Sequence, residues 1–205
     1  MSIHLHASDW HITSCEQREA VAFIESTHYA GGAPNTGVAR HALRHVGDGR
    51  IYGVALWLPP TRRAAESVNR ANPRGVLALS RLCLADDVPT NGASFLLGRS
   101  MKMIDRATWP TLLTYADTLY GHTGAIYRAT NWTCLGEVPG SDAWISSTGE
   151  RRGRKRGKRN LSTIEMGELG FTRLPKMPKI KFVHHASEAE KRRGAASRFN
   201  LGSAS

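Results

Sequence analysis

Residues 76–84 read VLALSRLCL, an apolar run of the kind that forms a strand inside a covered sheet. Residues 94–106 (SFLLGRSMKMIDR) carry apolar residues at helical intervals, and Asn91 and Gly92 before them are typical of a turn. A buried strand, a turn and a helix in this order indicate a sheet with helices packed against it. We therefore expect a fold of the α/β class.

The remaining residues up to 149 supply further elements of both kinds. Ser14 and Gln17 have the spacing of a capping box, which predicts a helix over residues 15–27. The β-prone runs 37–46 and 50–58 are joined by Gly-Asp-Gly, a strong hairpin signal. We also expect a polar surface helix at 61–70, strands at 111–116, 132–138 and 143–147, and a helix at 122–130.

The positive charge is concentrated in the last quarter of the chain. The formal net charge of the 205 residues is +11. Residues 1–149 hold 13 basic and 12 acidic residues, whereas residues 150–205 hold 15 basic and 5 acidic ones. We therefore predict a folded domain over 1–149 and a basic, flexible extension over 150–205 with little core of its own.

The densest charge in the extension is the run RRGRKRGKR, with seven positive residues in nine. Such a run repels itself and stays solvated unless a polyanion neutralises it. It is either a solubilising tail or a nucleic-acid-binding arm, and segregation of the charge favours the arm, on DNA or RNA alike. The predicted nucleic-acid-binding residues are Arg151, Arg152, Arg154, Lys155, Arg156, Lys158 and Arg159.

Several classes of protein are disfavoured by composition. The chain is 40% hydrophobic, but no apolar run approaches the ~20 residues of a membrane-spanning helix, and MSIHLHASDW lacks the apolar stretch of a signal peptide. Three cysteines without a close-spaced partner suggest neither a disulfide framework nor a zinc site. His184 and His185 lie in the basic extension without a nearby acid or cysteine, so we expect no metal site. These features predict a protein of the cytoplasm that does not contact membranes.

Residues 115–132 (YADTLYGHTGAIYRATNW) hold the richest cluster of polar and aromatic residues. Asp117 lies where a predicted strand ends, and Tyr127 lies on the following helix. Strand ends of this kind are where open α/β sheets hold ligands, so the two side chains can face one pocket. Equally, Asp117 can cap the helix region while Tyr127 is a core aromatic.

This order of elements resembles the GNAT acyltransferase superfamily, whose mixed sheet splays open to hold the acyl donor. The motif YADTxxGHxGxIYxAxNW is similar to the Mom DNA-modification proteins of Mu-like bacteriophages, which are themselves GNAT-like. Further places that agree with this family are His28-Tyr29, Ser80-Arg81 and Ser94. The resemblance covers residues 15–140 and implies a GNAT-like, splayed mixed sheet flanked by helices.

The resemblance also implies a function. It predicts an enzyme that converts adenine in double-stranded DNA to N6-carbamoylmethyladenine and so protects phage DNA from restriction in the bacterial host. The residues that match catalytic positions are His28, Tyr29, Asp117 and Tyr127. Arg81 and Ser94 match donor-binding positions, and Gly92 offers a backbone amide beside them.

The donor is left open by the residues. An activated glycyl group, for example on an aminoacyl-tRNA, accounts for the product, and an acyl-CoA is the usual GNAT donor. The GNAT pyrophosphate loop is incomplete, because residues 86–93 (DDVPTNGA) contain one glycine and two acids. Those acids would repel a pyrophosphate, so tRNA is a second candidate partner of the basic extension.

Two other functions stay open at this point. One is a GNAT acyltransferase that acts on a protein, a tRNA or a small-molecule amine. The other is a nucleic-acid-binding protein without activity, in which the acyl pocket has degenerated. An acid and a phenol in one polar cluster favour an enzyme. The sequence makes no prediction of the oligomeric state.

Overall fold

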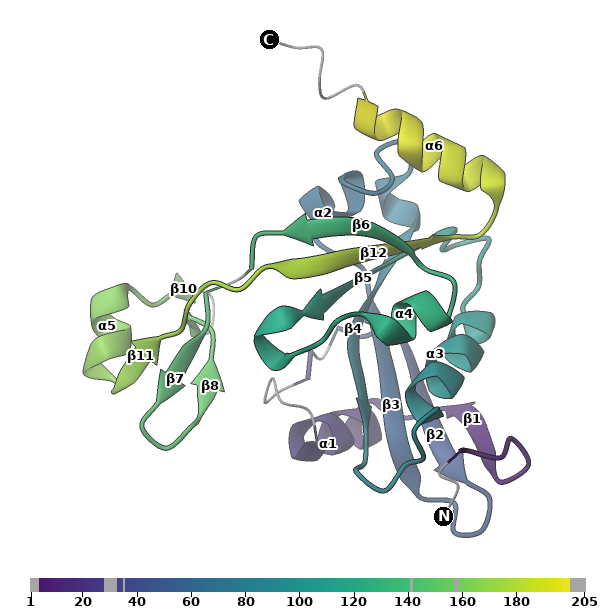
Figure 1. Cartoon of the computed structure of the whole chain (residues 1–205), viewed down its shortest axis with the longest axis horizontal. Helices are drawn as coiled ribbons and strands as arrows, with labels where there is room; N and C mark the ends of the chain where they lie inside the picture. The colour runs from purple at the N-terminus through teal and green to yellow at the C-terminus, as the bar shows by residue number, and fades with distance from the viewer. Residues whose placement is uncertain (1–3, 28–32, 35, 141, 157–158, 200–205) are drawn as a thin grey trace.

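The computed structural model describes residues 4–27, 33–34, 36–140, 142–156 and 159–199, and its centre is a seven-stranded mixed sheet (Figure 1). In spatial order the strands are β1 (Trp10–Ser14), β2 (Ala39–His45), β3 (Ile51–Leu58), β4 (Val76–Leu84), β5 (Thr111–Asp117), β12 (Lys179–His185) and β6 (Thr133–Val138). Strands β4 and β5 are parallel, and the other neighbours in this sheet are antiparallel. The expected α/β class and the β2–β3 hairpin are confirmed.

Helices cover both faces of the sheet, which explains why its central strands are apolar along their length. In β3, Val54 and Leu56 belong to the core under helix α1 (Gln17–Thr27). The alternate residues Ala55 and Trp57 belong to the core under helix α3 (Gly92–Met103). Strand β4 spans the same residues that the sequence predicted, because an apolar run of this length has few other solutions.

The start of the chain corrects one prediction. Ser14 is the last residue of β1, a strand that the sequence did not indicate, and it is not the cap of α1. The first turn of the helix is instead closed by Glu19, whose Oε2 accepts a hydrogen bond from the Glu16 backbone N–H (3.0 Å). Strand β1 is short and mixed in polarity, so only its pairing with β2 defines it.

The parallel pair β4–β5 opens after a few residues. Val76–Ala78 pair with Thr111–Leu113, and beyond Ala78 and Leu113 no pairing between these strands continues. Strand β4 nevertheless runs on to Leu84 with β3 as its neighbour, and β5 runs on to Asp117 with β12. The predicted splay is thus present and leaves a gap between the two strands.

Short helical elements follow β5 and connect β3 to β4. The 3-10 helix η2 (Thr118–Tyr120) and helix α4 (Ala125–Ala129) follow β5, and α4 starts three residues later than expected because Gly124 has a φ of +78°. Helix α2 (Arg62–Glu66) and the 3-10 helix η1 (Pro73–Gly75) connect β3 to β4. Ala65 of α2 is buried, so this segment is less superficial than predicted.

The prediction for residues 150–205 needs correction. Strand β12 comes from this segment and lies between β5 and β6 in the middle of one half of the sheet. Its apolar residues Phe182 and Val183 are fully buried on opposite faces of the sheet. Burial of these side chains stabilises the strand in its ordered form. A boundary after residue 149 therefore does not separate the main sheet from an appendage.

Residues 143–174, which we call the basic module, project beyond the end of the main sheet (Figure 1). The module contains β7 (Trp144–Ser146), β8 (Arg151–Arg152), β9 (Lys155–Arg156), β10 (Arg159–Asn160), α5 (Thr163–Glu168) and β11 (Phe171–Arg173). It has its own small core of Trp144, Leu161, Met166 and Phe171. Helix α6 (Glu188–Phe199) follows β12, and no helix in the described ranges is long and apolar enough to cross a membrane.

Candidate active site

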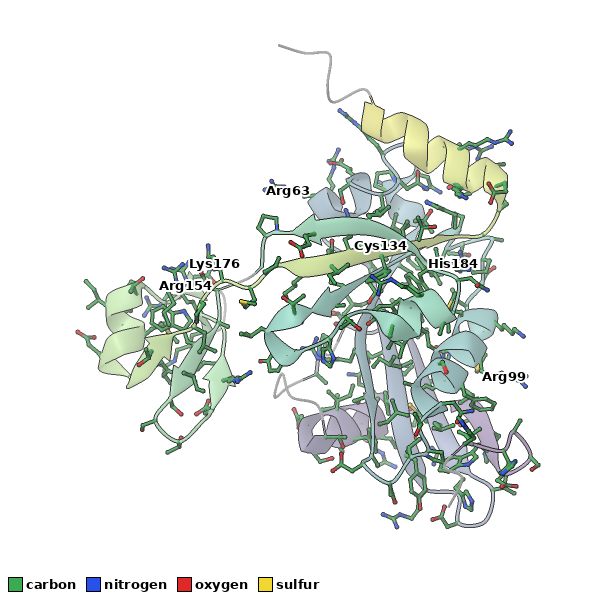
Figure 2. All side chains as sticks on the ribbon, viewed as in Figure 1. Arg63, Arg99, Cys134, Arg154, Lys176 and His184 are labelled. Carbon is green, nitrogen blue, oxygen red and sulfur yellow. The ribbon has the colours of Figure 1, made fainter. Side chains whose placement is uncertain are left out.

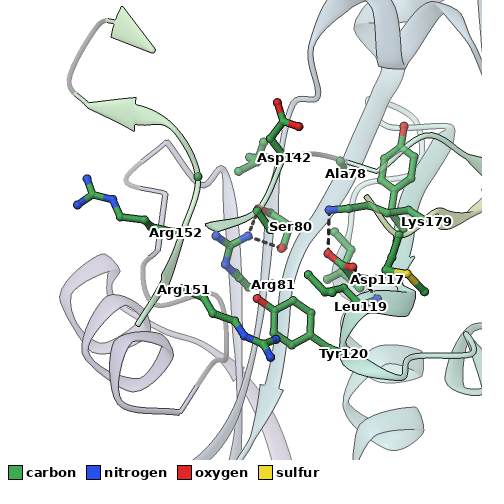
Figure 3. Close-up of a pocket in the computed structure, with 16 residues that line it drawn as sticks. Ala78, Ser80, Arg81, Asp117, Leu119, Tyr120, Asp142, Arg151, Arg152 and Lys179 are labelled. Atoms are coloured by element: carbon green, nitrogen blue, oxygen red, sulfur yellow. Dashed lines mark hydrogen bonds and ion pairs between the residues drawn. The ribbon is translucent and has the colours of Figure 1, made fainter. Parts of the chain in front are cut away.

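A pocket of about 430 Å³, which we call the Asp117 pocket, lies beside the opening between β4 and β5 (Figure 3). Strand β4 contributes Ser80 and Arg81 to it, and β5 contributes Tyr115 and Asp117. Tyr115 packs against the core under α2, so the pocket opens on the α1/α2 face of the sheet. The pocket lies at the end of β5, where the sequence predicts a ligand site.

The carboxylate of Asp117 is held from two sides. Its Oδ2 lies 2.9 Å from Nζ of Lys179, and its Oδ1 accepts a hydrogen bond from the Leu119 backbone N–H (3.2 Å). Lys179 reaches it because the two residues are direct partners in the β12–β5 ladder. The Asp117 side chain is 16% exposed, so it is oriented by its neighbours and still accessible from the pocket.

A second pocket of about 260 Å³, which we call the Tyr127 pocket, lies on the other side of the opening. It is bordered by Thr114 and Ala116 of β5, by the loop 121–125, and by Tyr127 of α4. Tyr127 is 8% exposed. Burial raises the pKa of its phenol, while a hydrogen bond with the Thr114 side chain acts in the opposite direction. At neutral pH the phenol is therefore protonated and can donate a hydrogen bond.

Asp117 and Tyr127 do not line one pocket. Alternate residues of β5 point to opposite faces of the sheet, and this places Asp117 on the α1/α2 face and Tyr127 beside the α3/α4 face. The two pockets nevertheless share Leu79, Ser80 and Tyr115, which lie where β4 and β5 part. The arrangement can hold two reactants on either side of the sheet and bring them together at the opening.

The predicted donor-site residues lie in different places. Nη1 of Arg81 donates to the Ser80 carbonyl oxygen (2.9 Å), and Arg81 lines the Asp117 pocket. The Ser94 hydroxyl donates to the Asn91 carbonyl oxygen (2.9 Å) and borders a separate groove of about 630 Å³. Gly92 is buried against Val88, whose Cγ1 would lie 2.3 Å from an added Cβ. Ser94 and Gly92 line neither the Asp117 pocket nor the Tyr127 pocket.

The start of α3 has two polar groups that are already bonded within the chain. Backbone amides at the N-terminus of a helix are a common binding site for phosphate groups. Here the Gly92 N–H donates to the Pro89 carbonyl oxygen (2.8 Å), and Oδ1 of Asn91 accepts from the Leu5 N–H (2.6 Å). The Gly92 amide is thus engaged within the chain, and the loop before it carries the two aspartates noted in the sequence.

The basic run divides into residues with different surroundings. Arg154 is paired with Asp142 (3.4 Å), just before the module, and Arg159 is paired with Glu165 (2.7 Å) within it. Arg156 is exposed on the β9–β10 hairpin. Figure 2 shows Arg154 together with Lys176, a second partner of Asp142, where the module joins the main sheet.

Arg151 and Arg152 lie on β8 and both line the Asp117 pocket. Lys155 lies on β9. The predicted residues His28, Tyr29 and Lys158 fall outside the described residues, and so does any contact that they make.

Two residues of the site were not indicated by the sequence. Tyr120 lines the Asp117 pocket from η2, and Lys179 comes from the first position of β12. Tyr120 lies inside the motif segment that drew attention to Asp117, so the segment contained a signal for it. Lys179 has no such signal, because only the register of β12 on β5 places it beside Asp117.

The described residues contain no group of three or more His, Cys, Asp or Glu side chains that could hold a metal ion. His184, which the sequence placed in a flexible extension, lies on β12 in the main sheet (Figure 2). There its Nδ1 is 3.4 Å from Nη1 of Arg106, and burial together with this guanidinium lowers the pKa of the imidazole.

Comparison with known proteins gives the family. The sequence profile of the Mom protein family matches residues 9–185, from the start of the main sheet to the end of β12. The chain belongs to the Mom protein family. The expected resemblance is confirmed, and the match includes the basic module, which the motif alone did not cover.

A curated relative of this Mom family protein is the "Methylcarbamoylase mom" of Escherichia phage Mu, with 29% identity over 126 residues. The match covers 57% of this chain and 49% of the relative, so it spans about half the length of that protein.

Solved structures show the same fold at low identity. The ribosomal-protein-S5-alanine acetyltransferase of Vibrio fischeri has a TM-score of 0.54 at 7% identity, covering 90% of this chain and 97% of that one. The ribosomal-protein-S18-alanine N-acetyltransferase of Escherichia coli has a TM-score of 0.52 at 10% identity, covering 87% and 94%. The Mom family protein therefore has the GNAT acetyltransferase fold.

Proposed function

We propose that this protein is a DNA-modifying acyltransferase that converts adenine to N6-carbamoylmethyladenine in the cytoplasm of a bacterial host. The observation that carries the proposal is the family match, which encloses both pockets, together with the name of the phage Mu relative. The modified base would protect phage DNA from restriction. The basic module supplies the charge that a double-stranded DNA substrate requires.

The chemistry begins at a weak nucleophile. The lone pair of the exocyclic N6 of adenine is delocalised into the ring, so its attack on a carbonyl carbon needs a base to take the N6 proton. In the proposal Asp117 is that base, with His28 as a relay or an alternative. The hydrogen bonds to Lys179 and Leu119 orient the carboxylate for this role.

Tyr127 acts on the other reactant. A phenol is protonated at neutral pH, and burial raises the pKa of this one further, so it can stabilise the developing oxyanion or protonate the leaving group. It reaches the reaction from the Tyr127 pocket, where the acyl group of the donor would lie. Tyr29 is proposed to contact the adenine.

The product suggests the chemical class of the donor. In a first step N6 attacks the carbonyl carbon of an activated glycine, the bond from this carbon to its leaving group breaks, and N6 loses a proton to the base. In a second step the new glycyl amine attacks C6, the bond from C6 to the original N6 breaks, and that nitrogen becomes the carboxamide. The glycyl amide and the carbamoylmethyl product are isomers, so the second step needs no further reactant.

This route requires a glycyl ester or thioester, such as an aminoacyl-tRNA. An acyl-CoA is less suited, since Asp86 and Asp87 before α3 would repel its diphosphate and the Gly92 N–H is already bonded to Pro89.

Mass spectrometry of nucleosides tests the proposal. Plasmid DNA from bacteria that express the wild-type chain should contain deoxyadenosine that is heavier by one glycyl residue. The Asp117→Asn variant should yield only unmodified deoxyadenosine, because the base is lost while the shape of the site is kept. Asp9→Asn is a matched control, since Asp9 is exposed at the far end of the sheet.

Retained modification in Asp117→Asn would exclude Asp117 as the base. Unmodified DNA with the wild-type chain, in cells where the protein is folded and abundant, would contradict the proposed function. In that case acylation of tRNA, a protein or a small-molecule amine would be examined next in the same cells.

A further inference from the structure

The basic module forms one wall of the Asp117 pocket. Arg151, Arg152 and Gly153 of the module line the pocket opposite β4 and β5. The volume of about 430 Å³ lies within the range of about 300–1,000 Å³ that is usual for small-molecule sites. The module is therefore placed to do more than attract a polyanion, because it also shapes the pocket that holds Asp117.

Arg151 differs from its neighbours in the basic run. The carbon of its guanidinium lies 4.8 Å from the centre of the Tyr120 ring, inside the pocket (Figure 3). Among the described residues, no carboxylate lies within ion-pair distance of Arg151, in contrast to Arg154 and Arg159. A guanidinium that lies over a ring keeps its N–H groups available for a planar, bidentate acceptor such as a phosphate.

The remaining charges of the pocket support an anionic ligand with a hydrogen-bond donor. Arg81 also lines it, while Lys179 is paired with Asp117, and Asp142 is paired with cations of the module and its linker. Asp117, the other carboxylate of the lining, is 16% exposed and can accept a further hydrogen bond from an amine. Leu58, Leu79 and Leu119 supply apolar surface for a flat ring.

We propose that the Asp117 pocket receives one adenine nucleotide turned out of the DNA duplex, and that Arg151, held on Tyr120, binds the phosphate of that nucleotide. The inference deepens the proposed function and rests on it. The exocyclic amine of the base points to Asp117, as an enzyme that acts on N6 requires. The basic run then has two roles: Arg151 holds the target nucleotide, whereas exposed residues such as Arg156 attract any duplex.

The test compares the binding of two DNA duplexes without a donor. One duplex contains a single adenine opposite cytosine, and the other has the same sequence with that adenine opposite thymine. A mispaired base costs less to turn out of the stack, so the wild-type chain should bind the first duplex about tenfold more tightly. The ratio of the two dissociation constants is the readout.

The Arg151→Ala variant should bring this ratio close to one while still binding the paired duplex. Arg151→Lys keeps the charge and loses the planar stacked guanidinium. Its ratio of dissociation constants should lie between those of the wild-type chain and Arg151→Ala. Arg156→Ala is the matched control: it should weaken binding of both duplexes equally and leave the ratio unchanged. Thermal unfolding of each variant shows whether the module is intact.

An unchanged ratio in both Arg151 variants would overturn the role of Arg151, and a wild-type ratio of one would overturn the pocket assignment. Neither result depends on catalysis. A wild-type chain that modifies DNA and shows no preference would refute the inference and leave the proposed function standing. A preference for the mispaired duplex without any modification of DNA would refute the proposed function and leave the assignment of the pocket to a turned-out nucleotide standing.

Discussion

Asp117 and Lys179 lie far apart in the sequence and opposite each other in the sheet. Their contact, 2.9 Å between Nζ and Oδ2, orients a carboxylate that lines the Asp117 pocket. Lys179 does not need to touch a substrate for this effect. It is a positioning residue for the proposed base.

At this scale we predict the effect of Lys179→Met. The variant should lower kcat for adenine modification on the order of 10²-fold, since a misplaced catalytic group costs rates of this size, and change KM little. Lys179→Arg should restore part of kcat because a guanidinium can reach the same carboxylate. The measurement is the rate of modified-adenine formation, with Lys102→Met on the exposed side of α3 as control. A wild-type kcat in Lys179→Met would refute the positioning role.

At the scale of elements, the loop between η2 and α4 sets the position of Tyr127. Gly121 and Gly124 both have left-handed backbone angles, with φ of +74° and +78°. Their surroundings differ, because a Cβ on Gly124 would lie 2.3 Å from the Phe182 ring, whereas one on Gly121 would have no atom within 4 Å. Close contact with β12 therefore depends on Gly124.

The two glycines form a natural pair for a test. Each substitution by alanine should cost about 1 kcal/mol for the left-handed backbone. Gly124→Ala should lose about 1–3 kcal/mol more than Gly121→Ala, because the added methyl group forces α4 away from Phe182. Denaturant unfolding of both variants measures the difference, and equal losses would show that α4 adjusts without strain.

Most elements follow from local patterns. The apolar run of β4 predicted that strand with its bounds, and the Gly-Asp-Gly turn predicted β2 and β3 with small boundary errors. Helix α1 was found, but its start was misplaced because a Ser-x-x-Gln pattern at Ser14 also occurs at the end of a strand. Strand β12 was missed because lysines around three apolar residues are equally compatible with a strand and with a solvated tail.

For the whole molecule, the fold decides how the basic run can be tested. Deletion of residues 150–205 would remove β12, which pairs with both β5 and β6, and would unfold half of the sheet. Loss of DNA binding in such a deletion would therefore say nothing about charge. Substitutions within the run avoid this difficulty.

We predict that changing Lys155, Arg156 and Lys158 together to glutamine makes duplex binding less dependent on salt. The slope of log K against log salt should become less negative by about 0.9 for each phosphate that the variant no longer neutralises. The control removes the same charge at exposed positions elsewhere, Arg18, Arg50 and Lys102. Equal slopes for the two triple variants would contradict a specific role of the run.

The sequence alone determined the α/β class, most of the elements before residue 149 and the segment 115–132 that contains Asp117 and Tyr127. These features depend on short-range periodicity and turn residues, which act within a few positions of the chain. The tertiary structure alone decided that Asp117 and Tyr127 lie on opposite faces, that Lys179 binds Asp117, and that Arg151 covers Tyr120. Each of these depends on strand order and register between distant segments, where a shift of one residue would turn every side chain to the other face.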